Sequence, residues 1–198
     1  MKEYSLVCKA AKKYKATTNS NHKLPVAPNL LNQEFSVSTP NRIWVSDFTY
    51  LWTPEGWMYL AVVIDLFSRR VVGWSISKHM TKGFVIEAMK MAIRQRRPAL
   101  GLIAHSDRGS QYCSHDYQKL LKDNHIFCSM SKKGDCYDNA CAETFFHSLK
   151  VEWIYGNSFR TREECRQSVI EYIEVFYNRQ RLHSYLGYTT PCQFEQAA

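Results

Sequence analysis

The 198-residue chain lacks the features that mark membrane and secreted proteins. No run of about 18 apolar residues occurs, so no helix is expected to span a bilayer. The N-terminus, MKEYSLVCKAAKKYK, has no apolar core of a secretory signal. We therefore expect a cytoplasmic protein without a membrane partner.

Paired cysteines and internal repeats are also missing. The seven cysteines are an odd number and include no C-x-x-C pair, which argues against a disulfide framework. The spacing of Cys136, Cys141 and His147 fits no structural zinc site. What remains is a composition of 45% hydrophobic and 14% aromatic residues, which is typical of one packed globular domain.

The charge of the chain is unevenly distributed. The net charge of +8 is compatible with a polyanionic partner such as DNA, and equally with ordinary solubility. Residues 1–24 hold six lysines against Glu3, which is +5 of the +8. We interpret residues 1–40 as a basic N-terminal arm or linker, and residues 41–198 as the core with a C-terminal helical extension.

Three β-rich runs open the predicted core. Turn residues at 53–56 and 68–70 separate the runs IWVSDFTYLW, WMYLAVVIDLF and VVGWSISKHM, so two hairpins and three antiparallel strands are predicted. The middle run contains LAVVID, which is almost continuously apolar and predicts a strand buried on both faces.

Helices and short strands alternate after these runs. The predicted elements are a helix capped by Thr81, a strand LIAHSD, a helix from Ser114 to Asn124, a strand IFCSM, a helix capped by Asp138 that ends near Val151, and a helix from about Arg162 to Arg179. This order describes a mixed α/β fold.

Three carboxylates have surroundings that suit phosphoryl-transfer chemistry. Asp47 lies inside an apolar strand, Asp107 ends a second strand, and Glu143 lies on a predicted helix. An unpaired charge within an apolar strand is costly, whereas carboxylates that converge from different elements can hold hard divalent cations. The alternative for each acid is a solvated turn or helix residue.

Five motifs resemble those of the OrfB-type transposases of the bacterial insertion-sequence group three. These proteins are DDE-type members of the retroviral-integrase superfamily, and the resemblance covers about residues 25–195. The motifs are NRIWVSDFTY (41–50), IDLFSRRVVGW (64–74), HSDRGSQY (105–112), SKKGDCYDNACAETFFHSLK (131–150) and YNRQRLHSYLGYTTP (177–191).

The resemblance implies a fold and an activity. The fold would be ribonuclease-H-like, with a mixed five-stranded sheet that begins with three antiparallel strands and is flanked by helices. The activity would be metal-dependent DNA strand cleavage and strand transfer in transposition of an insertion sequence. Asp47, Asp107 and Glu143 would be catalytic and would bind Mg²⁺ or Mn²⁺, with two ions bridged by Asp47 and no small-molecule cofactor.

The resemblance also implies partners. The partners would be transposon-end and target DNA, bound by a homo-oligomer. Lys150 lies seven positions after Glu143, where the family carries a basic residue that contacts the transposon end. At about 100° per residue, Glu143, His147 and Lys150 share one helix face. The predicted DNA-contacting residues are Lys132, Lys133, Arg108, His147 and Lys150.

Two features have alternative interpretations. His105 would either tune the site near Asp107 or be a hydrogen-bonded core histidine. The tail over 177–191 interleaves basic and aromatic residues, so it would either bind nucleic acid or pack on the core as a C-terminal cap.

Two further functions compete with the transposase prediction. Full-length members of the group carry a helix-turn-helix region before the catalytic domain, and this sequence shows none. The chain could thus be a catalytically silent DNA-binding remnant that modulates the full-length transposase. The third hypothesis is a nuclease that acts on RNA–DNA hybrids.

Overall fold

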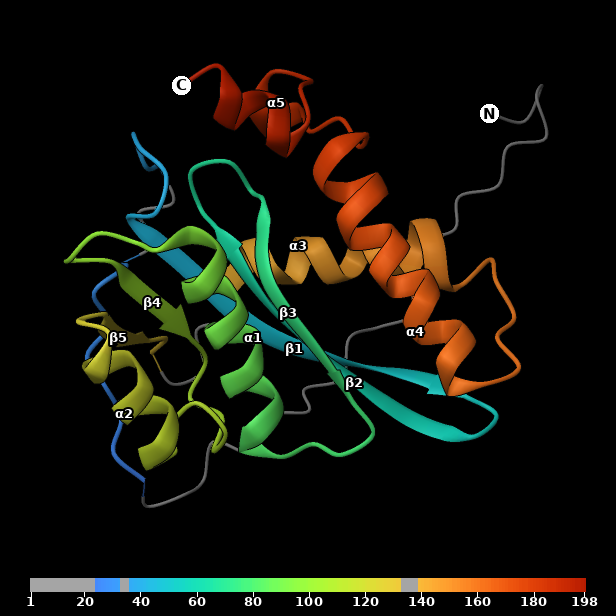
Figure 1. Ribbon diagram of the computed structural model, residues 1–198, viewed down its shortest axis with the longest axis horizontal. Coiled ribbons are helices and arrows are strands. Elements are labelled where there is room, and N and C mark those ends of the chain that lie inside the picture. Colours follow the sequence, from blue (N-terminus) through green and yellow to red (C-terminus); the bar gives the residue numbers. More distant parts are fainter. Residues whose placement is uncertain (1–23, 33–35, 133–138) are drawn as a thin grey trace.

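The computed structural model describes residues 24–32, 36–132 and 139–198. Its centre is a five-stranded sheet in the order β3-β2-β1-β4-β5, with helices on both faces (Figure 1). The strands are β1 (Ile43–Thr53), β2 (Gly56–Asp65), β3 (Val71–Ser77), β4 (Ile103–Ser106) and β5 (Phe127–Met130). The α-helices are α1 (Lys82–Arg96), α2 (His115–Asp123), α3 (Ala140–Ser148), α4 (Arg162–Glu171) and α5 (Pro191–Gln196).

The pairing of the strands confirms the predicted mixed sheet. Strand β2 pairs antiparallel with β1 and with β3, as the two predicted hairpins require. Strand β4 pairs parallel with both β1 and β5. The central strand β1 therefore has an antiparallel neighbour on one side and a parallel neighbour on the other.

Alternating side chains of the sheet divide the core into two layers. On β2, Leu60, Val62 and Ile64 pack with α3 and α4, whereas Ala61 and Val63 pack with α1 and α2. This confirms the prediction that LAVVID is buried on both faces, because successive side chains of a strand point to opposite sides.

The first two helices begin near the predicted residues. The side chain of Ser114 accepts a hydrogen bond from the backbone N–H of Tyr117 and caps α2. Thr81 is the residue before α1, but its side chain makes no capping hydrogen bond, so the predicted cap is only positional.

Helix α3 lies against the sheet. It packs against β1 and β2, while Phe145 contacts Tyr172 and Tyr177 on its other side. The chain does not end this helix near Val151 as predicted: it continues as a π-helical segment, η3 (Leu149–Ile154). A second π-helical segment, η4 (Tyr172–Tyr177), follows α4 within the predicted long helix. Six residues of apolar periodicity do not distinguish a π-helical turn from an α-helical one.

The C-terminal tail packs back on the core. The side-chain amide of Asn178 donates to the carbonyl of Val71 and accepts from its N–H, both at 3.0 Å, which covers the edge of β3. Arg181 forms an ion pair with Glu152 of η3. Of the two interpretations of the tail, the structure therefore supports packing as a cap.

The described N-terminal segment lies along the other edge of the sheet. Pro28 accepts a hydrogen bond from the N–H of Met130, and Leu30 donates to the hydroxyl of Ser129. Since residues 1–23 lie outside the described ranges, the division of the chain at residue 40 stays a prediction. None of the helices within the described ranges has the length and apolar character that crossing a bilayer requires.

Candidate active site

The sheet register brings Asp47 and Asp107 together. The parallel pairing of β1 with β4 ends at Ser46 opposite Ser106, and each aspartate is the next residue along the chain: Asp47 within β1 and Asp107 just after β4. Neighbouring strands lie about 4.8 Å apart, so the two aspartates begin from adjacent backbone positions. Sixty positions of sequence therefore separate two residues that the backbone holds side by side.

Backbone N–H groups orient both carboxylates. The N–H of Phe48 donates to Oδ1 of Asp47 at 2.8 Å, and the N–H of Gly109 donates to Oδ1 of Asp107 at 2.8 Å. Asp107 is the first residue after the end of β4.

Helix α3 brings the third carboxylate toward this pair. Asn139, directly before α3, is buried, and its side-chain amide donates to the carbonyl of Ser46 at 3.5 Å. This contact fixes the start of α3 beside Asp47. Glu143 follows one turn later and is half-buried.

The charges around Asp47 disfavour its ionisation. Burial raises the pKa of Asp47 well above its ordinary value, and the negative charge of Asp107 raises it further. The N–H of Phe48 opposes this rise, Glu143 adds to it, and the ammonium of Lys150 opposes it. A carboxylate whose pKa is raised by two neighbouring acids is a position where a divalent cation would relieve repulsion.

Burial also raises the pKa of the half-buried Glu143.

Lys150, which belongs to η3, lies beside the carboxylates. Its Nζ is 5.1 Å from the centre of the Tyr50 ring, and burial lowers its pKa while the charge of Asp47 raises it. The projection that placed Lys150 beside Glu143 assumed a regular α-helix. The chain turns into a π-helix at Leu149, yet Lys150 still reaches the same side as Asp47.

Tyr112 is a site residue that sequence reasoning did not single out. Its side chain is buried, and its hydroxyl has no hydrogen-bond partner among the described residues. Burial raises the pKa of Tyr112, and the charges of Asp47 and Asp107 raise it further. Its place in the HSDRGSQY motif was the available signal, because the motif extends to the tyrosine.

The donor set fits hard divalent cations. Asp47 and Asp107 offer adjacent carboxylate oxygens, which Mg²⁺ and Mn²⁺ prefer. The buried hydroxyl of Tyr112 could donate to either carboxylate in its charged form. No three acidic, histidine or cysteine side chains of the described residues gather into a metal-binding cluster.

The sequence matches a known family over both halves of the core. Residues 37–136 match one model described as an integrase core domain, and residues 143–198 match a second model with the same description. The chain is 50% identical over 195 residues to an uncharacterized 31 kDa protein of insertion element IS600 from Shigella sonnei. It is 52% identical over 195 residues to the transposase InsF of insertion sequence IS3A from Escherichia coli.

These alignments cover 98% of this chain, and 72% and 68% of the two relatives. The chain belongs to the integrase-core transposases of the IS3 group. As the sequence predicted, it is a DDE-type polynucleotidyl transferase by family.

Solved structures show the same fold at low sequence identity. The integrase catalytic core of HTLV-2, in a trimeric form with magnesium, matches with a TM-score of 0.60 at 20% identity and covers 81% of this chain and 99% of that one. An integrase chain in an intasome of simian T-cell lymphotropic virus matches with a TM-score of 0.67 at 19% identity, over 91% of this chain and 62% of that one. The predicted ribonuclease-H-like fold is therefore confirmed.

Three other residues predicted to contact DNA lie within the described ranges. Lys132 is exposed and follows Ser131, whose N–H donates to the carbonyl of Ser106 beside Asp107. The guanidinium of Arg108 donates to the carbonyl of Ser131. His147 is exposed one turn after Glu143. Lys133 and the predicted helix cap Asp138 lie outside the described residues.

His105 belongs to the packing of the transposase core. It is fully buried, and its ring nitrogens lie 2.8 Å from the hydroxyl of Ser129 and 3.2 Å from that of Ser131. These contacts tie β4 to β5 and to the residue after it. They support the interpretation as a hydrogen-bonded core histidine.

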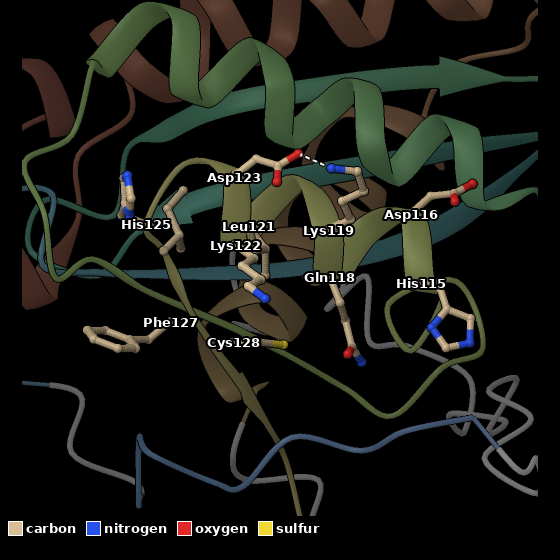
Figure 2. A pocket seen from close by; sticks show the side chains of 11 residues that line it. His115, Asp116, Gln118, Lys119, Leu121, Lys122, Asp123, His125, Phe127 and Cys128 are labelled. Carbon is tan, nitrogen blue, oxygen red and sulfur yellow. Dashed lines mark hydrogen bonds and ion pairs between the residues drawn. The ribbon is translucent and has the colours of Figure 1, made fainter.

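A surface pocket formed by α2 and β5 lies away from this chemistry. Figure 2 shows its lining on α2 and β5, where Lys119 and Asp123 form an ion pair. None of the three carboxylates lines this pocket. We place the candidate active site at the aspartate pair, because the convergence of charged groups there matters more than volume.

Proposed function

We propose that Asp47, Asp107 and Glu143 form the catalytic and metal-binding site for DNA cleavage and strand transfer. The observation that carries this proposal is that Asp47 and Asp107 each directly follow one of the paired residues Ser46 and Ser106, with Glu143 and Lys150 close enough for their charges to act on Asp47. Two divalent ions, Mg²⁺ or Mn²⁺, would activate the attacking oxygen and stabilise the leaving oxygen of the phosphodiester.

The chain's own residues would prepare the site for that chemistry. Asp47, with Asp107 and Glu143, would supply carboxylate oxygens to the ions, and the charges of both other acids act on it. The N–H groups of Phe48 and Gly109 hold the two aspartates in one orientation. Lys150 would hold a DNA phosphate beside them, with Arg108, Lys132, Lys133 and His147 as further phosphate contacts.

The partners follow from the family. We propose that the chain acts on transposon-end and target DNA in the bacterial cytoplasm and works there as a homo-oligomer. The related integrase core of HTLV-2 occurs in trimeric and dimeric forms with magnesium. No small-molecule cofactor is proposed.

Nicking of supercoiled plasmid DNA tests the catalytic assignment. The wild-type chain is expected to nick the plasmid with Mn²⁺ or Mg²⁺ and to stop when EDTA is added. Asp47→Asn, Asp107→Asn and Glu143→Gln should each lower the rate by roughly 100-fold or more, since loss of a metal ligand costs several factors of ten. Asp123→Asn, an exposed acid on α2, is the matched control and should retain activity.

The same assay separates the competing functions. Equal nicking by wild type and all three variants would refute the assigned roles. Plasmid binding without metal-dependent nicking would identify a silent DNA-binding remnant. Faster cleavage of an RNA–DNA hybrid than of duplex DNA would favour a ribonuclease-H-type nuclease.

A further inference from the structure

The hairpin of β1 and β2 extends beyond the rest of the sheet. Strand β1 pairs with β4 only from Ile43 to Ser46, and β2 pairs with β3 only from Tyr59 onward. The pairing of β1 with β2 continues to Thr53 opposite Gly56. Beyond the carboxylate site, the chain is thus a two-stranded ribbon whose tip lies beside the start of α4 (Figure 1).

Exposed aromatic side chains line this ribbon. Trp52 and Trp57 are opposite each other, with ring centres 4.9 Å apart, and Tyr50 lies 5.1 Å from Trp57. Trp52 is 58% exposed and Trp57 is 44% exposed. Tyr155, which follows η3, is 66% exposed. Cross-strand aromatic pairs stabilise a ribbon, but that role does not require large exposed surfaces next to an active site.

A groove of about 580 Å³ runs along these rings. It is lined by Tyr50, Trp52, Trp57 and Tyr155 together with Lys150. Lys150 is the lysine of the groove, and its Nζ lies 5.1 Å from the centre of the Tyr50 ring. At the hairpin tip, the guanidinium of Arg162 lies against Gly56, close to the acid Glu55, which accepts from the backbone N–H of Arg162.

Aromatic faces beside cations are the surface that single-stranded nucleic acid prefers. Bases stack on aromatic rings, while lysine or arginine holds the phosphates between them. The groove has this composition, and the net charge of +8 complements a polyanion. A paired duplex keeps its bases stacked inside and cannot offer their faces to Trp52 or Trp57.

We propose that the aromatic ribbon, defined as Tyr50, Trp52, Trp57 and Tyr155, binds unpaired nucleobases of a DNA strand whose phosphate lies at Lys150. The inference deepens the proposed function, because the strand would reach the ribbon from the reacting phosphodiester. It assigns to the hairpin the role of holding a melted strand end.

Binding of oligonucleotides in EDTA tests this proposal without any catalytic step. Trp52→Ala and Tyr155→Ala should each weaken binding of a fluorescent single-stranded oligo-dT about tenfold, and binding of a blunt duplex less than twofold. Trp52→Phe keeps an aromatic face and should restore most of the affinity. Phe127→Ala removes an equally exposed aromatic residue from β5, 58% exposed, and should change neither affinity.

Other outcomes would overturn the proposal. Unchanged oligo-dT binding in both alanine variants would refute the base contact, and Tyr155→Ala decides the matter if Trp52→Ala fails to fold. Equal weakening of single strands and duplex would show a general DNA contact. Conversion of an oligomer to a monomer with unchanged DNA binding would show that the ribbon is a protein interface. Because no metal is present, failure of the catalytic assignment would leave these results unaffected.

Discussion

Asp47 carries a charge where the folded chain disfavours one. Burial and the neighbouring acids raise its pKa, so the folded state binds a proton there more tightly than the unfolded state does. The stability from that proton is fully present below the ordinary pKa of 3.8 and is lost as pH rises through the raised pKa. At neutral pH, the Asp47 carboxyl group therefore lowers the stability of the metal-free chain.

Asp47→Asn should make the metal-free chain more stable while it abolishes nicking. We expect the free energy of unfolding at pH 7 in EDTA to rise, because the neutral amide removes a charge that burial and the neighbouring acids disfavour. Thermal unfolding at pH 7 and pH 4 measures the effect, which should shrink at pH 4. Asp123→Asn should show no such gain, and an unchanged or lower stability of Asp47→Asn would contradict the argument.

At the scale of elements, α1 and β3 meet at a glycine. A Cβ on Gly73 would lie 2.3 Å from the carbonyl oxygen of Ala88 and 2.7 Å from the backbone nitrogen of Ala92. The helix backbone cannot yield as a flexible side chain would. The close approach of α1 to the sheet thus depends on the missing side chain.

Gly73→Ala should push α1 away from the sheet and destabilise the chain by about 1–3 kcal/mol, as overpacking does. Gly83→Ala is the matched control in the first turn of α1, where the new Cβ would meet only the Thr81 hydroxyl at 3.5 Å. That substitution should be neutral or stabilising by up to about 1 kcal/mol. Urea unfolding compares the two, and equal effects would refute the packing argument.

Elements with strong local patterns were predictable. The strands β1 and β2 and the start of α2 near Ser114 follow from neighbouring residues. The π-helical segments η3 and η4 were not, because their hydrogen bonds depend on how α3 and α4 pack together. The indole of Trp153 in η3, for example, donates to the hydroxyl of Ser168 in α4 at 2.8 Å.

At the scale of the whole molecule, one carboxylate near the C-terminus connects distant parts of the chain. Glu195 of α5 accepts hydrogen bonds from Arg96 of α1, from Arg70 before β3 and from the hydroxyl of Ser68. Burial opposes ionisation of Glu195, but these hydrogen bonds outweigh it and lower the pKa. A single side chain therefore joins the last helix to the sheet and to α1.

Glu195→Gln should destabilise the chain at pH 7 by roughly 1.5–3 kcal/mol, the usual cost of hydrogen bonds to charged groups. Since the pKa of Glu195 lies below 4.5, its stabilisation is present above that pH and is lost as pH falls through the lowered value. The difference from wild type should therefore disappear in acid. Glu163→Gln, in an exposed pair with Arg166, is the control and should cost less than about 1 kcal/mol.

Contacts of this range could not be predicted from the sequence. Ser68 and Glu195 are 127 positions apart, and the sequence around either residue does not indicate that the other is its partner. The adjacency of Asp47 and Asp107 was expected only through the family resemblance, since periodicity alone does not say which strands pair in parallel. The two hydrogen bonds between the side chain of Asn178 and the backbone of Val71, which hold the tail on the core, likewise depend on tertiary packing.

The backbone pairing of Ser46 with Ser106 has a consequence for how this protein can change in length. The pairing of β1 with β4 sets the spacing of the two aspartates. The length of the chain segment that connects them through β3 and α1 does not affect it. Extra residues between Ser77 and Lys82, or between Arg97 and Leu102, would leave the two acids neighbours. Deletion of one residue within β4 would instead turn Asp107 to the opposite side of the sheet, where α1 and α2 pack.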